Sequence, residues 1–258
     1  NETAREFGTI FLPAASTFEK EGTFMNAERR IQRVRRALSP RGNSLPDWVI
    51  VQRVAHALGT KHGFEFESAE AIWNEVRTVW PAVAGITYAR TEDQGIQWPC
   101  LSEASPGTEV LHAESFPKGP RAALARIDYR PTSEAVSAEF PFLLVTGRTL
   151  FHFNAGTMTY RTPNVILQPA DYLDLSPEDA MRLSISDGEK VRVRSRYGAT
   201  TLTARHNLGI PNGQLFATFH DKRTFVNHLT SPHRDSHVSS PEYKVTAVQI
   251  EQLTDKVH

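Results

Sequence analysis

The feature that most constrains the fold of this chain is a strictly alternating stretch in its last third. From Val191 to Asn207 the sequence reads VRVRSRYGATTLTARHN, so valines would face one side of a strand and arginines the other. A period of two is typical of a β-strand with one buried face. Tyr197-Gly198 interrupts the alternation and predicts a hairpin turn. This part of the chain is therefore expected to be β-structure.

Further strands and one helix extend this pattern. Ser176-Pro-Glu-Asp179 is a capping box with proline at the first helical position, and it predicts a short helix over 177–183. Several short strands with one inserted helix indicate a small closed barrel. The apolar runs that predict the other strands are Phe140–Thr146, Gly213–His220 and Lys244–Leu253.

The first third of the sequence mixes helical and strand patterns. In places, apolar residues recur at helical spacing. A polar residue that can cap a helix precedes such a stretch, and Gly or Pro follows it. The expected elements are a strand over Thr9–Leu12 and helices over Asn26–Leu38, from Asp47 to Gly59 and from Ser68 to Pro81.

From Ala82 to about Pro131 the periodicity fades, and Gly, Pro and isolated aromatic residues dominate. Such a segment is too long for a simple loop and too rich in aromatic residues for a disordered linker. We place a domain boundary near residues 131–136. The sequence thus predicts an α/β portion over 1–135 and a β-barrel domain over 136–258.

Composition excludes several classes of function. The 29 basic and 29 acidic side chains cancel, so no net field favours nucleic acid. No stretch approaches the ~20 apolar residues of a membrane span. The N-terminal sequence NETAREFGTIFLPAAS lacks the basic and apolar regions of a signal peptide, and it lacks an initiator Met. We therefore expect a fragment of a longer cytoplasmic protein.

The single cysteine limits the metal chemistry that this chain can supply. One thiol excludes an internal disulfide and a self-contained Cys-ligated zinc or iron–sulfur site. We interpret Cys100 as a packed residue beside Trp98 and Pro99. Histidines are dense between His220 and Lys244, but their spacing is irregular, so metal ligation there is the weaker interpretation.

The basic run over 28–36, ERRIQRVRR, has two interpretations. The arginines could bind phosphate. On a helix with Ile31 and Val34 buried, they would instead form a solvated face, and we prefer this second interpretation.

The segment from Thr146 to Thr159, TGRTLFHFNAGTMT, carries the densest polar chemistry. A buried strand leads into Gly147, and Arg148, a histidine, an asparagine and several threonine hydroxyls follow. A fork-shaped cation, rotatable hydroxyls and backbone N–H groups exposed at glycines can hold a pyrophosphate or a polar heterocycle. The alternative is a polar loop at a strand end that binds nothing.

Several ordered motifs resemble the molybdopterin oxidoreductase superfamily, also called the DMSO reductase superfamily. The first are FLPAA at 11–15, EKEGTFMNAERRIQ at 19–32 and PDW at 46–48. GIQWPC at 95–100 narrows the resemblance toward formate dehydrogenases. So do TGR at 146–148, GTMT at 156–159, SPEDA at 176–180 and PEYK at 241–244.

The resemblance implies an α/β portion followed by a double-psi β-barrel, which together with upstream domains hold bis-molybdopterin guanine dinucleotide with Mo or W. It also implies that the metal-ligating Cys or selenocysteine, the substrate Arg and the Cys motif of a [4Fe-4S] cluster lie upstream. The residues onto which the family's cofactor contacts map are Gly147, Arg148, His152, Asn154, Thr157, Phe219, His220, Asn227, Tyr243, Lys244, Glu21, Gly22, Thr23 and Asn26.

The resemblance further implies that the whole subunit oxidises formate to CO2 and passes electrons to electron-transfer subunits, while this part alone is inactive. Two other functions stay open. The chain could come from another molybdopterin oxidoreductase, such as a nitrate reductase, because the barrel is shared. It could also be a stand-alone module for cofactor binding or assembly without turnover.

Overall fold

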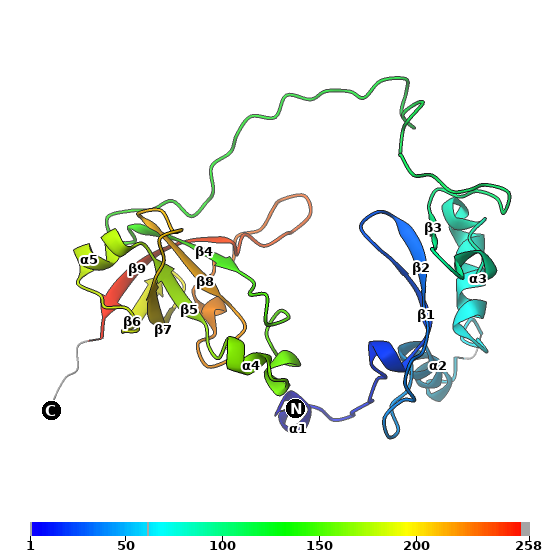
Figure 1. Cartoon of the computed structure of the whole chain (residues 1–258), viewed down its shortest axis with the longest axis horizontal. Helices are drawn as coiled ribbons and strands as arrows, with labels where there is room; N and C mark the ends of the chain where they lie inside the picture. The colour runs from blue at the N-terminus through cyan, green and yellow to red at the C-terminus, as the bar shows by residue number, and fades with distance from the viewer. Residues whose placement is uncertain (1, 61, 254–258) are drawn as a thin grey trace. The chain divides into compact units, whose positions relative to one another are not determined.

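The computed structural model describes residues 2–60 and 62–253 and divides the chain into two compact units. Unit 1 is Asn1–Ala125 and unit 2 is Arg126–His258 (Figure 1). Each unit has its own hydrophobic core. None of the helices in the described residues is long and apolar enough to cross a membrane.

Unit 1 is a small antiparallel sheet with two longer helices. The sheet has the order β1-β2-β3, and its core includes Ile31, Trp73 and the fully buried Ile86. Its elements are α1 (Glu2–Glu6), η1 (Thr17–Glu19), β1 (Gly22–Met25), β2 (Arg30–Val34), α2 (Asp47–Ala57), α3 (Ala69–Val79), η2 (Pro81–Val83), η3 (Ala89–Thr91) and β3 (Ile96–Gln97).

The expected strand over Thr9–Leu12 and the expected helix over Asn26–Leu38 are both wrong. Residues 9–12 have no strand partner and are exposed. Residues 22–34 form the β1–β2 hairpin, whose turn places Arg29 at φ +65° and uses the Asn26 side chain to accept the backbone N–H groups of Glu28 and Arg30. An asparagine that satisfies its own turn competes with helix formation, and here the turn wins.

The arginines of the basic run do not form the solvated helical face that we preferred. Arg29 donates to the backbone carbonyls of Thr108 and Glu109, and Arg30 donates to the carbonyl of Gly95. The guanidinium of Arg33 lies 3.9 Å from the centroid of the Tyr88 ring. These contacts pin the irregular segment after residue 82 to the hairpin, because an arginine can satisfy several carbonyls that no strand would pair.

The two longer helices of unit 1 are confirmed. α3 begins after Ser68, whose hydroxyl accepts the N–H of Ala71 at 3.0 Å. α2 begins at Asp47 itself, and Gly59 follows its end at φ +83°. The apolar side of α2 is partly uncovered in unit 1, since Val51 is 54 % and Val54 41 % exposed.

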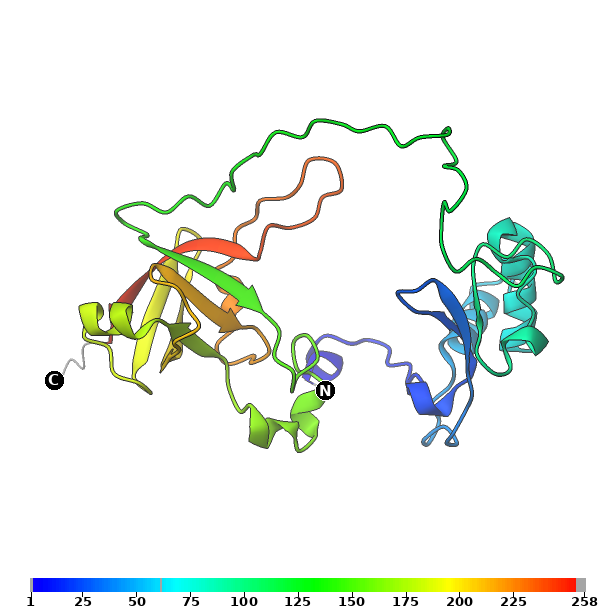
Figure 2. The same ribbon diagram turned by 45° about the horizontal axis from the view of Figure 1, so that its top comes forward.

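Unit 2 is a closed β-barrel with the strand order β4-β8-β5-β7-β6-β9 (Figure 2). Two pairs, β4 with β8 and β5 with β7, are parallel, and the others are antiparallel. Its elements are β4 (Phe142–Gly147), η4 (Thr159–Arg161), α4 (Asn164–Leu167), β5 (Tyr172–Leu175), α5 (Pro177–Leu183), β6 (Lys190–Ser195), β7 (Ala199–His206), β8 (Gln214–Thr218), η5 (Val226–His228) and β9 (Val245–Gln252).

The sequence pattern predicted this barrel well. Val191 and Val193 are fully buried, while Arg192 faces outward, and β6 pairs with β7 across the expected hairpin. The helix α5 has the expected bounds, with the Ser176 hydroxyl accepting the N–H of Asp179 at 3.0 Å. Alternation is informative here because one face of every strand lines a single closed core.

The first prediction concerns Glu134, which precedes the sequence-based boundary but belongs to the barrel. Its side chain is 1 % exposed and accepts the N–H of Ala247 at 3.1 Å and the hydroxyl of Tyr197 at 2.5 Å. We expect a 126–258 piece to melt cooperatively as a β-rich protein. A 136–258 piece, which loses these bonds, should be less stable by about 1–3 kcal/mol.

Circular dichroism and urea titration of the two pieces check this prediction, with Glu134→Gln in the 126–258 piece as the control that keeps the side-chain volume. The Gln variant should resemble the shorter piece in stability. Helix-dominated circular dichroism of the 126–258 piece would contradict the expectation that unit 2 folds by itself.

The second prediction concerns the pH dependence of stability through Asp179. Burial acts to raise the pKa of this carboxyl, but hydrogen bonds from Arg182, the N–H of Gly213 and Ser176 outweigh it, so the pKa lies below 3.8. A lowered folded-state pKa means that the stabilisation is complete above pH 3.8 and is lost as pH falls through the folded value.

Asp179→Asn should therefore lower the free energy of unfolding at pH 7 by about 1–3 kcal/mol. The difference from wild type should shrink below pH 3.8. Urea titrations at several pH values measure it, with the exposed Asp128→Asn as the control. A difference that is independent of pH would show that the carboxylate charge is not what stabilises α5.

Candidate functional site

Strand polarity places the candidate residues of unit 2 at one end of the barrel. Because β4 and β8 are parallel, with Gly147 paired to Thr218, their carboxyl ends meet at one edge. β9 runs antiparallel to β4, with Val245 paired to Val145, so it begins at that same edge. The heads of β4 and β8 and the start of β9 lie at this end in both views (Figures 1 and 2).

The loop after β4 carries the exposed cation Arg148. Its Nε donates to Oδ1 of Asn154 at 3.0 Å, and Asn154 takes the left-handed conformation at φ +49°. Gly156, at φ +70°, is buried, and a Cβ there would lie 2.8 Å from the carbonyl oxygen of His220. Glycine is thus required where this loop packs against the segment that follows β8.

Three stacked rings join the loop to the end of β8. The ring of His152 lies 4.4 Å from that of His220 and 4.6 Å from that of Tyr160, measured between centroids. Nδ1 of His152 is 2.8 Å from the Thr159 hydroxyl, and its Nε2 is 2.7 Å from the Gln168 carbonyl. Both ring nitrogens of His152 therefore have partners within the chain, so the imidazole is fixed in place.

The start of β9 adds a second exposed cation. Nζ of Lys244 donates to the carbonyl of Thr146 at 3.3 Å and lies 5.3 Å and 5.9 Å from the ring centroids of Tyr243 and Phe219. The Thr146 hydroxyl donates to the carbonyl of Tyr243 at 2.8 Å. These contacts bind the beginning of β9 to the end of β4. We call the residues of this barrel end the strand-end cluster: Gly147, Arg148, His152, Asn154, Phe219, His220, Tyr243 and Lys244.

Two predicted residues stand apart from these contacts. Thr157 is exposed in the loop after β4, and Asn227 is exposed in η5. The Asn227 carbonyl accepts the Thr230 hydroxyl at 3.0 Å. Neither side chain makes a hydrogen bond to the strand-end cluster within the described residues, although Thr157 lies in the same loop as Arg148 and His152.

The sequence interpretation missed Asp171, the buried carboxylate beneath the cluster. It is 1 % exposed and directly precedes β5. Its oxygens accept the hydroxyl of Thr218 at 2.6 Å and the backbone N–H groups of His220 and Asp221 at 3.0 and 2.9 Å. No motif marks Asp171, and the only sequence signal is an acidic residue at the start of an apolar strand.

Burial shapes the titration of two rings in the stack. Burial raises the pKa of Tyr160 to about 12, helped by the nearby carboxylates of Asp221 and Asp171. Burial also lowers the pKa of His220, against the opposing effect of Asp171. Both shifts favour the neutral forms of Tyr160 and His220, and the exposed cations Arg148 and Lys244 belong to the same barrel end.

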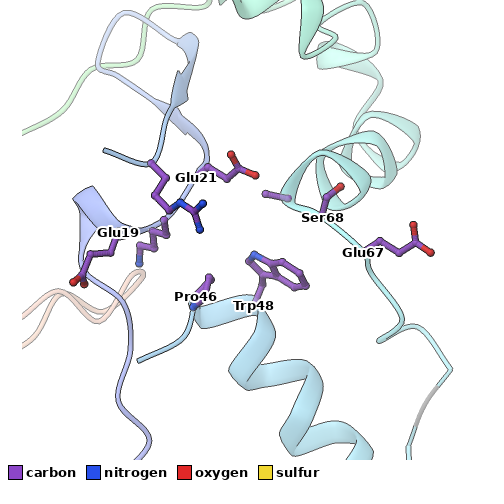
Figure 3. A pocket seen from close by; sticks show the side chains of 9 residues that line it. Glu19, Glu21, Pro46, Trp48, Glu67 and Ser68 are labelled. Carbon is purple, nitrogen blue, oxygen red and sulfur yellow. The ribbon is translucent and has the colours of Figure 1, made fainter. Parts of the chain in front are cut away.

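The predicted residues of unit 1 lie on or beside the β1–β2 hairpin. Asn26 is the turn residue described above, and Thr23 pairs with Arg33. A Cβ at Gly22 would meet open space, so sterics do not explain a glycine there. Glu21 lines a pocket of about 230 Å³ whose wall also includes Trp48, at the start of α2, and Ser68, the cap of α3 (Figure 3).

The described residues contain no group of three His, Cys, Asp or Glu side chains that could hold a metal ion. Cys100 is fully buried, as interpreted from the sequence, and its Sγ lies 3.4 Å from a guanidinium nitrogen of Arg90. The strand-end cluster offers exposed cations for polar binding.

A phosphate-bearing heterocyclic ligand fits this chemistry. Arg148 uses only Nε within the described residues, which leaves its terminal amines for an anion. The ring of His220 is 2 % exposed, yet its Nε2 has no hydrogen-bond partner in the described part of the chain. An orphaned buried nitrogen beside exposed cations marks a place where a ligand would complete the polar contacts.

Two protein families match this chain. Residues 142–247, which run from the first residue of β4 into β9, match the molydopterin dinucleotide binding domain. Residues 2–57 match the molybdopterin oxidoreductases. The first match contains every residue of the strand-end cluster.

Proteins with the same pattern over nearly the whole chain include two formate dehydrogenase subunits. The chain is 40 % identical to the F420-dependent formate dehydrogenase subunit alpha of Methanocaldococcus jannaschii, over 98 % of this chain and 38 % of that protein. It is 38 % identical to a subunit alpha from Methanococcus maripaludis, over 98 % of this chain and 37 % of that protein. A nitrate reductase of Symbiobacterium thermophilum is 34 % identical, over 96 % of this chain and 36 % of that protein.

A solved structure has the same fold. Acetylene hydratase from Pelobacter acetylenicus superimposes with a TM-score of 0.68 at 14 % identity, over 94 % of this chain and 38 % of that one. The superposition confirms the expected fold class. The chain spans about 38 % of the length of the formate dehydrogenase subunit that it matches at 40 % identity. The chain belongs to the molybdopterin oxidoreductases, and its β-barrel is their dinucleotide-binding domain.

Proposed function

We propose that this chain is the cofactor-binding part of a formate dehydrogenase catalytic subunit, and that the strand-end cluster holds a molybdopterin guanine dinucleotide. The observation that carries the proposal is the convergence of Arg148, Lys244 and the histidine stack at one barrel end inside the matched domain. Identity is higher to the formate dehydrogenase subunits than to the nitrate reductase, which favours formate over nitrate as the substrate of the whole protein.

Each residue of the cluster has a role that follows from its chemistry. Arg148 presents a fork of donors suited to a pyrophosphate, and Lys244 presents a compact charge to a phosphate or pterin oxygen. His220 and Asn154 offer hydrogen bonds to the pterin or guanine edge. The bound group supplies the two-electron chemistry at Mo or W, whereas the barrel supplies placement and charge.

Further members of the site are proposed from the resemblance. Thr157 and Asn227 would add contacts from exposed positions, and Glu21, Gly22, Thr23 and Asn26 would contribute from unit 1. The proposed partners are the upstream domains of the same subunit, with their [4Fe-4S] cluster, and the electron-transfer subunits of a cytoplasmic holoenzyme.

The third prediction is that Arg148→Ala and Lys244→Ala each weaken cofactor retention in the full-length subunit. A charge-assisted contact contributes roughly 1.5–3 kcal/mol, which corresponds to on the order of tenfold to a hundredfold in affinity. Metal and pterin content after purification measures the effect. An exposed charge without a ligand would change stability by only ~0.5 kcal/mol.

The matched control is Lys190→Ala. Lys190 is exposed and begins β6. Because β6 runs antiparallel to β9, and β9 begins at the strand-end cluster, Lys190 lies at the opposite end of the barrel. The cofactor content of this variant should equal that of wild type. Full occupancy in both cluster variants would overturn the assignment, and loss in only one would remove the other residue from the site.

The fourth prediction is that the 258-residue chain alone does not oxidise formate, even after reconstitution with cofactor. Its single cysteine is fully buried, with Sγ 3.4 Å from a guanidinium nitrogen of Arg90, so the thiol is not exposed to ligate a metal. Formate-dependent reduction of a redox dye by the purified chain is the assay, with the full-length holoenzyme as the positive control. Formate oxidation by the chain alone would contradict the proposal that catalysis also requires the upstream domains.

A further inference from the structure

The carboxylate of Asp171 accepts hydrogen bonds from four different residues of unit 2. It accepts hydrogen bonds from two hydroxyls, those of Thr218 at 2.6 Å and Thr224 at 2.9 Å. It also accepts the backbone N–H groups of His220 and Asp221. One of its oxygens lies 2.6 Å from Nδ1 of His220. A single side chain at the start of β5 thus fastens the whole segment from the end of β8 to residue 224.

That segment carries two members of the strand-end cluster. Phe219 lies between the anchored residues Thr218 and His220, and its ring is one of the two near which Nζ of Lys244 lies. His220 stacks on His152, which belongs to the loop after β4. Any shift of the segment would therefore move groups contributed by β8, by β9 and by the loop after β4.

Asp171 has no free acceptor for a ligand, because each of its two oxygens already accepts two hydrogen bonds. His220, which is similarly buried, differs in having a ring nitrogen without a partner in the described part of the chain. Burying a carboxylate costs desolvation free energy. Its hydrogen bonds offset this cost only while every donor stays in place. Such a group fixes the geometry of the residues that donate to it.

We propose that Asp171 is a positioning residue of the cofactor site, which acts by locking Phe219 and His220 in register with Arg148 and Lys244. This inference rests on the proposed function and adds a residue that lies outside the site itself. An amide at position 171 would present N–H donors to the backbone N–H groups that now donate there, so one side of the anchor would be repelled.

Unit 2 offers a matched control in Asp174, on β5, the strand that Asp171 directly precedes. Asp174 is 3 % exposed and accepts two hydrogen bonds from Arg205, at 2.6 and 2.9 Å, and one from Asn207 at 3.0 Å. Its partners lie where β7 ends, away from the strand-end cluster, because β5 and β7 are parallel. Asp174→Asn thus removes a similarly buried and bonded charge without touching the anchored segment.

The experiment compares Asp171→Asn and Asp174→Asn in the full-length subunit. Each purified variant is assayed for melting temperature, for pterin content per folded molecule, and for the rate of pterin release after dilution. We expect both variants to lose stability, but only Asp171→Asn to release pterin about tenfold faster than wild type. Histidine imidazole NMR resonances of the 258-residue chain provide a readout without cofactor: those of His152 and His220 should move in Asp171→Asn and stay in place in Asp174→Asn.

A milder variant keeps the test decisive if Asp171→Asn does not fold. Thr218→Val is isosteric and removes one donor to Asp171, so it should move the same resonances and speed release in the same direction by a smaller factor. Wild-type release rates in both Asp171→Asn and Thr218→Val, or equal acceleration in Asp174→Asn, would overturn the positioning role. Absence of pterin from the wild-type subunit would instead refute the proposed function.

Discussion

The strand-end cluster depends on one constraint, the parallel pairing of β4 with β8 inside a barrel whose other strands are mostly antiparallel. In an all-antiparallel barrel, neighbouring strands end at opposite rims, and a loop leaving one strand meets only the start of the next. Here two strands end side by side and β9 begins next to them, so segments near residues 148, 219 and 244 converge on one rim. Closure of the barrel fixes the register of all three, because no strand can slip without moving its inward-facing residues out of the core.

Buried carboxylates beneath that rim hold its segments in place through hydrogen bonds. Asp171 gathers donors from the end of β8, and the paired carboxylate of Asp221 holds Arg223 at 2.7 Å. Burial of such carboxylates is favourable only when every lone pair has a donor, and their hydrogen bonds meet that condition. Unit 1 uses the reverse arrangement, in which Arg29, in the turn before β2, and Arg30, at the start of β2, donate to carbonyls of an irregular segment. In both units, charged side chains organise backbone that lacks regular secondary structure.

The sequence predicted those parts of the fold whose pattern repeats. Alternation through Val191 and Val193 gave the β6–β7 hairpin, and a capping box gave the bounds of α5. The sequence-based prediction was wrong for β1 and β2. This short hairpin has one buried residue, Ile31, so its alternating pattern is too weak to distinguish it from a helix. Most of the cluster was found because Gly, Arg and His stand together after a strand or because of the family resemblance. Asp171 was not found, because its partners lie far along the chain and nothing local distinguishes it.

The loop after β4 explains why binding on the barrel would be one-sided. Beside the cation Arg148 it exposes Leu150 completely and Phe153 at 63 %. Exposed apolar groups around a fixed cation are unfavourable in water and favourable against a second surface. A dinucleotide held only by the rim would keep one face in solvent, whereas a covering surface would exclude water and strengthen each charge-assisted bond. Because the chain spans 38 % of the length of the formate dehydrogenase subunit matched at 40 % identity, that surface has a natural source in the upstream domains proposed above. Under the proposed function, the rim would supply orientation, and the covering surface would supply the low dielectric in which its charges act.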